Sequence, residues 1–299
     1  MQHPRVLVVI PCRNEEATLR ATLDSLLAQS VRPTRILVVN DGSTDGTSSI
    51  LQGYVERFPE TVRVVNRDGH GARDTGKGIA AVVNYGLARE ALTSYDFICK
   101  FDADLEFPSD YLQLVCTTLE ANDGLGLAGG ICLVNEGDGA WVPEVKAKLD
   151  HVRGALKTYR RAAFTKIGGI VEATGWDTID EHMLRYHGYG VSVLQGLRVK
   201  QYRPTNAATD RMKMADKIGR SLFNMRADPL VASISIAKRW SVLGGDMPLL
   251  PLVLGFVKPK WRGEKPPIDH LLGRSINAYR RRGFYQALGY RARSPGDGK

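Results

Sequence analysis

The chain has 299 residues, of which 43% are hydrophobic and 24% charged, and its formal net charge is +9. This length and apolar content suffice for one large α/β domain with an extension, which excludes a chain without a packed core. The cysteines show no C-x-x-C spacing, so we expect buried thiols in a reducing compartment rather than disulfides or a zinc site. They are Cys12, Cys99, Cys116 and Cys132.

Three apolar segments near the N-terminus predict parallel strands. Residues 5–10 form a β-branched run that ends at Pro11, and residues 35–39 run directly into a polar cluster. Residues 61–65 lead into a Gly-rich loop and a helical stretch at 79–90. This βαβαβ series predicts an open α/β sheet, and such sheets bind ligands beyond the carboxyl ends of their strands. Because the first strand starts almost at the N-terminus, we expect no signal peptide.

Two carboxylates, Asp102 and Asp104, follow the next apolar stretch at residues 95–99. Alternation along an extended chain sends residues i and i+2 to the same side, so these two side chains can converge at the end of a strand. Two acids that close repel each other unless a cation neutralises them, and Mg²⁺ or Mn²⁺ prefers oxygen ligands. Taken alone, the pattern is typical of an ordinary acidic turn, so the surrounding residues decide its meaning.

Three motifs stand in order along the chain, each after its own predicted strand. They read I-P-C-R-N-E-E from Ile10, V-V-N-D-G-S-T-D-G-T from Val38, and F-D-A-D from Phe101. Together they resemble the inverting family 2 glycosyltransferases over residues 5–200. The resemblance implies the GT-A fold, a mixed and mostly parallel sheet flanked by helices, and a nucleotide-diphospho-sugar donor.

The resemblance also assigns donor-binding roles at the first two strand ends. It implies that Pro11, Arg13 and Glu15 belong to the first nucleotide-binding loop and that Asp41 holds the base of the nucleotide. A carboxylate suits that role because it accepts a hydrogen bond from a ring N–H. The family usually has two acids at this point, whereas this chain has Asn40 before Asp41.

The third motif corresponds to the acids that handle the ribose and the metal. The resemblance implies that Asp102 and Asp104 perform these tasks, with Mn²⁺ or Mg²⁺ as the cofactor that bridges the diphosphate. Lys77 lies in a segment that resembles the family's border of the diphosphate, and the alternative for it is a solvated loop lysine.

An inverting transferase needs a general base that takes the proton of the acceptor hydroxyl. The candidates are Asp177 and Asp180, in the acidic stretch 175–181 that opens a predicted helix. Counting back from Gly188 by the family's spacing reaches Asp177, whereas a gap in the alignment would favour Asp180. The structural alternative is that Asp177 only caps the helix, with Asp180 completing a capping-box-like arrangement. Both aspartates therefore remain candidates.

The pattern divides the chain into a transferase domain and a C-terminal extension. The GT-A domain is predicted at residues 1–205, with a nucleotide-sugar half at 1–108 and an acceptor half at 109–205. A helical and apolar extension follows at 206–257, and a basic tail at 258–299. The last six residues of the tail, from Ser294 on, are expected to be disordered.

The extension predicts contact with an anionic membrane surface through residues 241–299. Residues 241–257 are apolar but broken by prolines, and this run falls short of the ~20 residues that a spanning helix needs, so it is typical of an interfacial or re-entrant segment. The basic tail carries 11 Lys/Arg and 3 Asp/Glu, a net charge of +8. Aromatic residues flank its Arg280-Arg281-Arg282 triplet, which suits anionic lipid. A solvated tail is the alternative, and nucleic acid is not expected as a partner.

The function hypothesis is an inverting, metal-assisted glycosyltransferase that uses a nucleotide-sugar donor and a glycan or lipid-linked acceptor in cell-envelope polysaccharide biosynthesis. It places the protein in the cytoplasm, peripheral at the inner face of the cell membrane. One alternative is a non-catalytic, membrane-associated nucleotide-sugar-binding protein. Another is a nucleotidyltransferase, which would need a Gly-rich triphosphate loop after the first strand, where residues 11–14 stand instead.

Overall fold

The computed structural model describes residues 3–68, 77–135, 137, 139–144, 150–203, 210–242 and 248–287. The chain divides into two compact units. The α/β unit consists of Met1–Glu172 and Met183–Ala207, and the helical unit consists of Ala173–His182 and Ala208–Lys299. The helical unit thus includes ten residues from the segment that the sequence assigns to the acceptor half.

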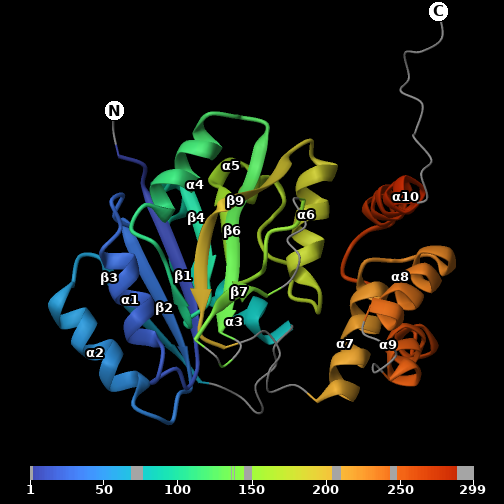
Figure 1. Ribbon diagram of the computed structural model, residues 1–299, viewed down its shortest axis with the longest axis horizontal. Helices are drawn as coiled ribbons and strands as arrows, with labels where there is room; N and C mark the ends of the chain where they lie inside the picture. Colours follow the sequence, from blue (N-terminus) through green and yellow to red (C-terminus); the bar gives the residue numbers. More distant parts are fainter. Residues whose placement is uncertain are drawn as a thin grey trace, which may run out of the picture. The chain divides into compact units, whose positions relative to one another are not determined.

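A mixed sheet, nine-stranded within the described residues, forms the centre of the α/β unit (Figure 1). Its main path runs β3-β2-β1-β4-β8-β6-β9-β5, and β7 pairs with β6. The first four strands of this path are parallel, β9 is parallel to β6, and β8 runs antiparallel to both of its neighbours. The strands are β1 (Val6–Cys12), β2 (Arg35–Asp41), β3 (Val62–Arg67), β4 (Phe97–Phe101), β5 (Leu105–Glu106), β6 (Leu125–Asn135), β7 (Trp141–Pro143), β8 (Leu156–Arg160) and β9 (Gly190–Gln201).

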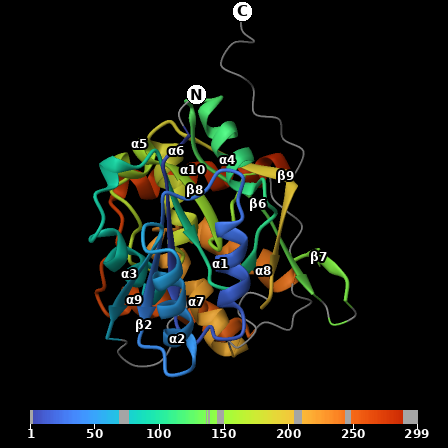
Figure 2. The same cartoon turned by 90° about the vertical axis from the view of Figure 1, so that its left-hand side faces the viewer.

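The two most apolar strands, β1 and β2, form the core of this sheet. Residues 6–10 and 36–39 are completely buried, as expected for parallel strands that are covered on both faces. On one side α3 comes so close to the sheet that a Cβ atom at Gly86 would lie 2.5 Å from the Val39 side chain. Figure 2 shows α1 and α2 in front of these strands. The predicted α/β fold with a mixed sheet and flanking helices is therefore confirmed.

The remaining elements of the α/β unit are helices that connect these strands. They are α1 (Leu19–Leu27), α2 (Thr47–Arg57), α3 (Lys77–Leu87), the short 3-10 turn η1 (Leu92–Ser94), α4 (Tyr111–Glu120) and α5 (Arg161–Lys166). The helix α6 (Trp176–Tyr186) begins in the helical unit and ends in the α/β unit. All four cysteines are buried free thiols, as predicted, and burial raises the pKa of Cys99 and Cys132 to about 12.

A close crossing of two helices organises the helical unit. The helices of this unit are α7 (Arg211–Asn224), α8 (Pro229–Val242), α9 (Leu249–Trp261) and α10 (His270–Ala287). A Cβ atom at Gly219 of α7 would lie 2.0 Å from the Leu252 carbonyl oxygen, and one at Gly255 of α9 would lie 2.2 Å from that of Asp216. The glycines therefore allow the two backbones to touch, and Leu252 and Ala215 are completely buried beside them.

The segment predicted as a basic tail is partly helical, because it contains the end of α9 and the whole of α10. At the start of α8, Asp228 Oδ1 accepts a hydrogen bond of 2.9 Å from the Val231 amide, and Pro229 is the first residue of the helix. The six terminal residues for which disorder is predicted lie outside the described residues. Over the described parts of the chain, we find no helix that is both long and apolar enough to cross a membrane.

Candidate functional site

The loops that follow β1 and β2 support each other at the carboxyl edge of the sheet. Asn14 has a left-handed backbone (φ 55°), and its Oδ1 accepts a hydrogen bond of 2.8 Å from the Thr44 amide. The amide of Glu15 donates to Thr47 Oγ1 at 2.8 Å, and Glu15 is only 3% exposed. The first two sequence motifs therefore form one interlocked structure, with the buried carboxylate of Glu15 inside it.

Asp41, the predicted partner of the nucleotide base, ends β2 and is mostly buried. Its Oδ1 accepts a hydrogen bond of 2.8 Å from the guanidinium of Arg67, which ends the neighbouring strand β3. Because the two strands are paired through Asp41 and Arg67, this ion pair is built into the register of the sheet. The carboxylate of Asp41 is thus held in one orientation at the strand edge.

Asn40, where the family usually has an acid, is buried and makes structural hydrogen bonds. Its Nδ2 donates to Ser48 Oγ and to Asn66 Oδ1, both at 3.1 Å, and its Oδ1 accepts from the Ser43 amide at 3.3 Å. An amide can donate and accept at once, whereas a carboxylate can only accept. Asn40 therefore joins the ends of β2 and β3 and the start of α2.

Asp102 follows β4 directly and lies beside a buried lysine. The amide of Asp102 donates to the Ala155 carbonyl at 2.9 Å, which anchors the backbone next to β8. Lys100 is 2% exposed, and its Nζ contacts Asp102 Oδ1 and donates to the Gly154 carbonyl at 2.9 Å. A buried ammonium needs a charged partner, so Lys100 and Asp102 form one electrostatic unit.

Asp104 is more buried than Asp102, and other carboxylates surround it. Its side chain is 7% exposed, and burial together with the charge of Asp102 raises its pKa to about 7. Arg203, which follows β9, places its Nε 3.5 Å from Asp104 Oδ2 and also contacts the carboxylate of Glu15. Arg203 therefore joins Glu15 and Asp104, and the charge of Asp102, which pairs with Lys100, also acts on Asp104.

This donor set fits a divalent cation. Among the described residues, no group of three or more His, Cys, Asp or Glu side chains is placed to hold a metal ion without further ligands. Mg²⁺ usually binds through one or two carboxylates together with substrate phosphates and water. Asp102 and Asp104 supply two carboxylates. The pKa of Asp104 is raised first by burial and then by the charge of Asp102, and a cation would relieve the second of these effects.

The other predicted donor residues lie at the same edge of the sheet. Pro11 and Arg13 stand at the end of β1 and just beyond it, and both are partly exposed. Lys77 is the first residue of α3 and is exposed. The Gly-rich loop before it, residues 69–76, lies outside the described residues. The diphosphate-binding role of Lys77 remains a prediction.

Both candidate bases lie on α6, in the part that belongs to the helical unit. Asp177 is in the first turn of α6, which starts at Trp176, so it does not occupy the cap position considered from the sequence. Asp177 is partly exposed, whereas Asp180 is completely buried. The two aspartates thus differ in access to a substrate, which a general base must be able to reach.

The loop that leads into α6 is fixed against α7. Asn224 Nδ2 donates to the Thr174 carbonyl at 3.0 Å, and Asn224 is 5% exposed. Gly175 has φ +84°, and a Cβ atom there would lie 2.1 Å from Ser221 Oγ. Any other residue at this position would be strained and would also clash, so Gly175 helps to set where Asp177 begins the helix.

Three basic residues of the site were missed in the sequence: Arg67, Lys100 and Arg203. Lys100 carried a usable signal, because a lysine within an otherwise apolar strand must find a partner when it is buried. Arg67 and Arg203 carried no local signal, because their carboxylate partners are 26 and 188 residues away in the sequence. Their roles follow from strand order, which is a tertiary property.

An aromatic cluster beside Asp104 was also missed. The Tyr202 amide donates to the Asp104 carbonyl at 2.9 Å, and the Tyr202 ring lies edge-on to Trp141 at 5.8 Å between centroids. Lys200 Nζ lies 5.6 Å from the centre of the Trp141 ring and donates to Glu106 at 2.9 Å. The β7 hairpin therefore places an aromatic surface next to the acidic residues.

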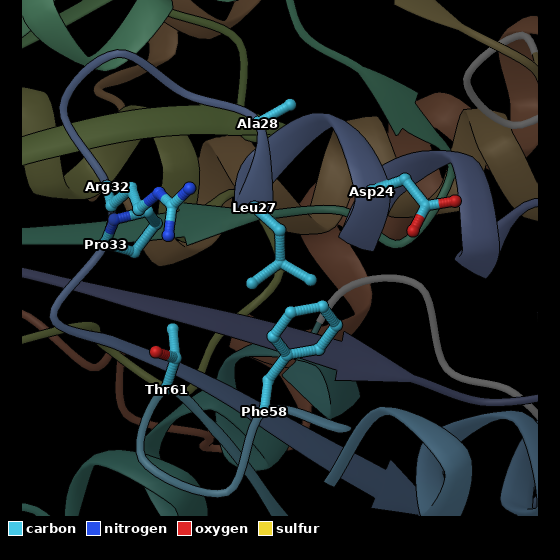
Figure 3. Close-up of a pocket in the computed structure, with 7 residues that line it drawn as sticks. All are labelled: Asp24, Leu27, Ala28, Arg32, Pro33, Phe58 and Thr61. Atoms are coloured by element: carbon cyan, nitrogen blue, oxygen red, sulfur yellow. The ribbon is translucent and has the colours of Figure 1, made fainter. Parts of the chain in front are cut away.

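A cavity of about 310 Å³ lies away from these residues, at the amino-terminal edge of the sheet (Figure 3). In Figure 3 the side chain of Leu27 points toward the ring of Phe58, and Arg32 and Asp24 lie at the sides. Asp24 Oδ1 already accepts a hydrogen bond of 2.6 Å from the Tyr54 hydroxyl. The cavity is lined by Asp24, Leu27, Ala28, Arg32, Pro33, Phe58 and Thr61, none of which belongs to the predicted site.

Solved glycosyltransferase structures share this fold. The chain is similar to the mannosyltransferase PcManGT from Pyrobaculum calidifontis, solved with GDP-Man and Mn²⁺, with a TM-score of 0.60 and 21% identity over 96% of this chain and 81% of that one. It is also similar to residues 1–349 of TarS from S. aureus, solved with UDP-GlcNAc, with a TM-score of 0.53 and 16% identity over 99% of this chain and 95% of that one. The predicted GT-A fold is thereby confirmed.

Sequence relatives agree with the structural ones. The chain is 26% identical over 224 residues to the beta-monoglucosyldiacylglycerol synthase of Synechocystis sp. (strain ATCC 27184 / PCC 6803 / Kazusa), an alignment that covers 69% of this chain and 45% of that protein. The chain spans less than half the length of the curated relatives it matches. The family model described as Glycosyl transferase family 2 matches residues 7–175, more than half of the chain. The chain therefore belongs to glycosyl transferase family 2, as its motifs predicted.

Proposed function

We propose that this chain transfers a sugar from a nucleotide-diphosphate donor to a hydroxyl group of a glycan or lipid-linked acceptor. The observation that carries the proposal is the gathering of Glu15, Asp102 and Asp104 at the carboxyl edge of the sheet in a chain of this family. Ligands of open α/β sheets bind at this edge. PcManGT, which shares the fold, was solved with a nucleotide sugar and Mn²⁺, which supports the same ligand classes here.

In this proposal the donor binds across the strand ends, with separate contacts for its nucleotide and for its diphosphate. Asp41, held by Arg67, accepts a hydrogen bond from the base of the nucleotide. Pro11, Arg13 and Glu15 border the nucleotide on the β1 side, and Lys77 at the start of α3 offers a cation to the diphosphate. The ion pairs formed before the donor arrives reduce the side-chain entropy lost on binding, because Asp41 is already oriented.

Asp102 and Asp104 are the residues that would hold a divalent cation, Mn²⁺ or Mg²⁺. A cation bound there would act as a Lewis acid that stabilises the departing nucleoside diphosphate. Arg203 balances the charges of Glu15 and Asp104, so that three carboxylates can stand close together in the folded chain.

We infer an inverting, single-displacement reaction with Asp177 as the general base. The acceptor oxygen forms a bond to the anomeric carbon while the bond from that carbon to the diphosphate breaks, and an aspartate takes the hydroxyl proton. Partial exposure of Asp177 and complete burial of Asp180 favour Asp177 for this role. Asp180 is the second candidate, and its burial suits a residue that orients the first turn of α6.

The proposal includes an anionic membrane surface as a partner, contacted through residues 241–299. It places the protein in the cytoplasm at the inner face of the cell membrane, where lipid-linked and cell-envelope glycan acceptors would be available. The supporting observation is the number of large apolar side chains exposed in the helical unit together with its basic charge.

Thermal unfolding with UDP, GDP, dTDP or CDP, each with and without Mn²⁺, tests the donor site. A ligand that binds only the folded state raises the apparent stability by RT ln(1 + [L]/Kd). We expect one nucleoside diphosphate to raise Tm in a metal-dependent way, and Asp104→Asn to remove the metal-dependent part. Stabilisation without any hydrolysis or transfer would favour the non-catalytic binding alternative. The absence of stabilisation by all four would contradict the donor proposal.

A further inference from the structure

Helix α9 has two apolar faces, and one of them packs inside the helical unit. Leu252, Gly255, Phe256 and Pro259 are buried on this inner face. Gly255 lies in backbone contact with α7, and a Cβ atom there would be 2.2 Å from the Asp216 carbonyl oxygen. The orientation of α9 about its own axis is therefore set by the crossing with α7.

The opposite face of α9, which we call the outer face, consists of Leu249, Leu250, Val253, Leu254, Val257 and Trp261. At 100° per residue these six apolar side chains fall within one sector of about 140°, which also contains Lys260 next to Leu249. Leu250 and Trp261 are 69% and 76% exposed, and Leu249 is 49% exposed. An outward helix face of a soluble domain is normally polar, so this surface needs an explanation.

Two exposed lysines frame the outer face in the last turns of α9. Lys258 lies at one edge of the sector. Lys260 lies near the other edge, with its Nζ 3.7 Å from the centre of the Phe256 ring. Long lysine side chains can cover apolar surface while their ammonium groups reach a polar boundary. The outer face is thus apolar in the middle and cationic at its margins.

Two residues of the arginine triplet of α10 make contacts inside the helical unit. Arg280 Nη2 lies 3.2 Å from Met225 Sδ, and burial lowers its pKa. Arg281 forms an ion pair with Asp228, the residue that caps α8. These two arginines are therefore less suited to a membrane surface than the sequence suggests, and Lys258 and Lys260 are better placed.

We propose that the outer face of α9 inserts into the headgroup–acyl boundary of an anionic lipid bilayer, with Lys258 and Lys260 at the lipid phosphates. The inference deepens the membrane association contained in the proposed function, and it names the element that makes the contact. A helix with this pattern lies in the plane of the interface. A tryptophan at one end of it suits the headgroup level.

The charge of the region selects lipid over a second copy of this chain. Residues 258–299 carry 11 Lys/Arg and 3 Asp/Glu. A two-fold symmetric dimer through the outer face would pair two surfaces of the same positive charge, which is unfavourable because like charges repel across an interface. Anionic lipid contributes about 1 kcal/mol per cation near the surface.

Co-sedimentation with vesicles tests the proposal on the full chain. The vesicles are phosphatidylcholine with and without about a third phosphatidylglycerol, and the variant is Leu250→Gln/Trp261→Gln. The two side chains are the most exposed of the outer face, so their replacement should leave the fold intact, as circular dichroism can verify. We expect wild type to bind the anionic vesicles. The affinity of the variant for these vesicles should be lower by a factor of about ten or more.

Leu271→Gln is the matched control, since Leu271 is 62% exposed on α10 of the same unit but lies outside the outer face. Its vesicle affinity should equal that of wild type. Equal losses in the control and the variant, or full binding by the variant, would overturn the proposal. So would equal binding to both vesicle types, since the lysines would then be irrelevant. A wild-type dimer in light scattering that the variant converts to a monomer would assign the face to a second copy instead.

The outcome is separable from that of the proposed function. Vesicle binding is measured without a donor, and the thermal shift with nucleoside diphosphates is measured without lipid on the same variant. Lost vesicle binding with an intact thermal shift supports the role of α9 alone. Intact vesicle binding in a chain that binds no nucleotide would refute the transferase proposal and leave the membrane face standing.

Discussion

The α/β unit and the helical unit use charge and apolar surface in opposite ways. In the α/β unit, the apolar side chains of residues 6–10 in β1 and 36–39 in β2 are completely buried, and acidic and basic groups of the site are paired with one another at the strand ends. Arg67 with Asp41, Lys100 with Asp102, and Arg203 with Glu15 and Asp104 form this set. In the helical unit, glycines bring two backbones together, and large apolar side chains point outward.

The difference shows two routes to a binding surface. Ordered ion pairs at a strand edge hold carboxylates in fixed places, which suits a small, polar ligand such as a nucleoside diphosphate. An apolar helix face with cations at its margins has no such fixed geometry, and it suits a broad, fluid surface. Asp177 and Asp180 on α6 belong to the helical unit by their contacts. Their replacement therefore tests first whether this unit contributes to the reaction as well as to surface binding.

The largest expected effect is that of Asp177→Asn on the transfer rate. Loss of a general base typically costs 10²–10⁴-fold, so kcat should fall by about that factor. The donor Kd should stay near the wild-type value, because Asp177 lies outside the donor-binding strand ends. The measurement is the transfer rate together with the Kd of the nucleoside diphosphate.

Asp180→Asn is the comparison for that experiment. Because Asp180 is completely buried, we expect its replacement to change stability more than kcat. If Asp180→Asn removes transfer while Asp177→Asn leaves it, the two assignments must be exchanged. If neither variant loses transfer, the base does not lie on α6.

The next largest effect is expected for Gly255→Leu at the helix crossing. The new side chain would meet the Asp216 carbonyl, so α7 and α9 must separate, at a cost of about 3 kcal/mol. Gly283→Ala is the control, since nothing lies within 4 Å of a Cβ atom at that position of α10. Alanine there should keep or raise stability.

This pair of variants separates the two units. We expect calorimetry of Gly255→Leu to show two transitions. That of the helical unit should move to a much lower temperature, while that of the α/β unit stays in place and is still stabilised by nucleoside diphosphate. A single transition that moves as a whole would mean that the units unfold together, and the comparison between them would then fail.

A smaller effect is expected when Asp41 loses its partner. In Arg67→Ala the carboxylate of Asp41 is no longer held, and a hydrogen bond to a charged group is worth about 1.5–3 kcal/mol. We therefore expect donor affinity to fall about tenfold in calorimetric titration. Arg63→Ala, which removes an ion pair with Glu90 from the same strand, should leave donor affinity unchanged. Equal losses in both variants would mean that β3 as a whole had been disturbed.

Much of the fold and part of the site could be predicted because their signals are local. The β-branched runs of β1 and β2 and the acids that follow β4 depend only on neighbouring residues and on strand alternation. The motifs then named the family. Arg203 could not be predicted in the same way, because its contact with Glu15 spans 188 residues and depends on where β9 lies in the sheet.

In the helical unit, the sequence predicted the character of the surface but not the residues that form it. Its apolar run suggested a membrane segment, but only the crossing at Gly219 and Gly255 determines which side of α9 remains outside. The sequence also could not show that Arg280 and Arg281 contact Met225 and Asp228, because these partners lie in the short connection between α7 and α8. Composition indicated the kind of surface, and packing decided which residues form it.

The smallest expected effect concerns the ion pair of Arg5 and Asp96 at the start of the sheet. Arg5 Nη2 lies 3.0 Å from Asp96 Oδ1, and hydrogen bonding from Arg5 lowers the pKa of Asp96. A carboxyl group whose pKa is lowered in the folded state stabilises it above the ordinary aspartate pKa of about 4 and loses that contribution as the pH falls through the lowered value. Arg5→Gln should therefore make Tm fall less steeply below about pH 4. Since the pair is exposed, the difference should also shrink at high salt, whereas the effects of Arg67→Ala at the more buried site should persist. Equal salt sensitivity in the two variants would remove the distinction between surface pairs and the pairs that hold the site.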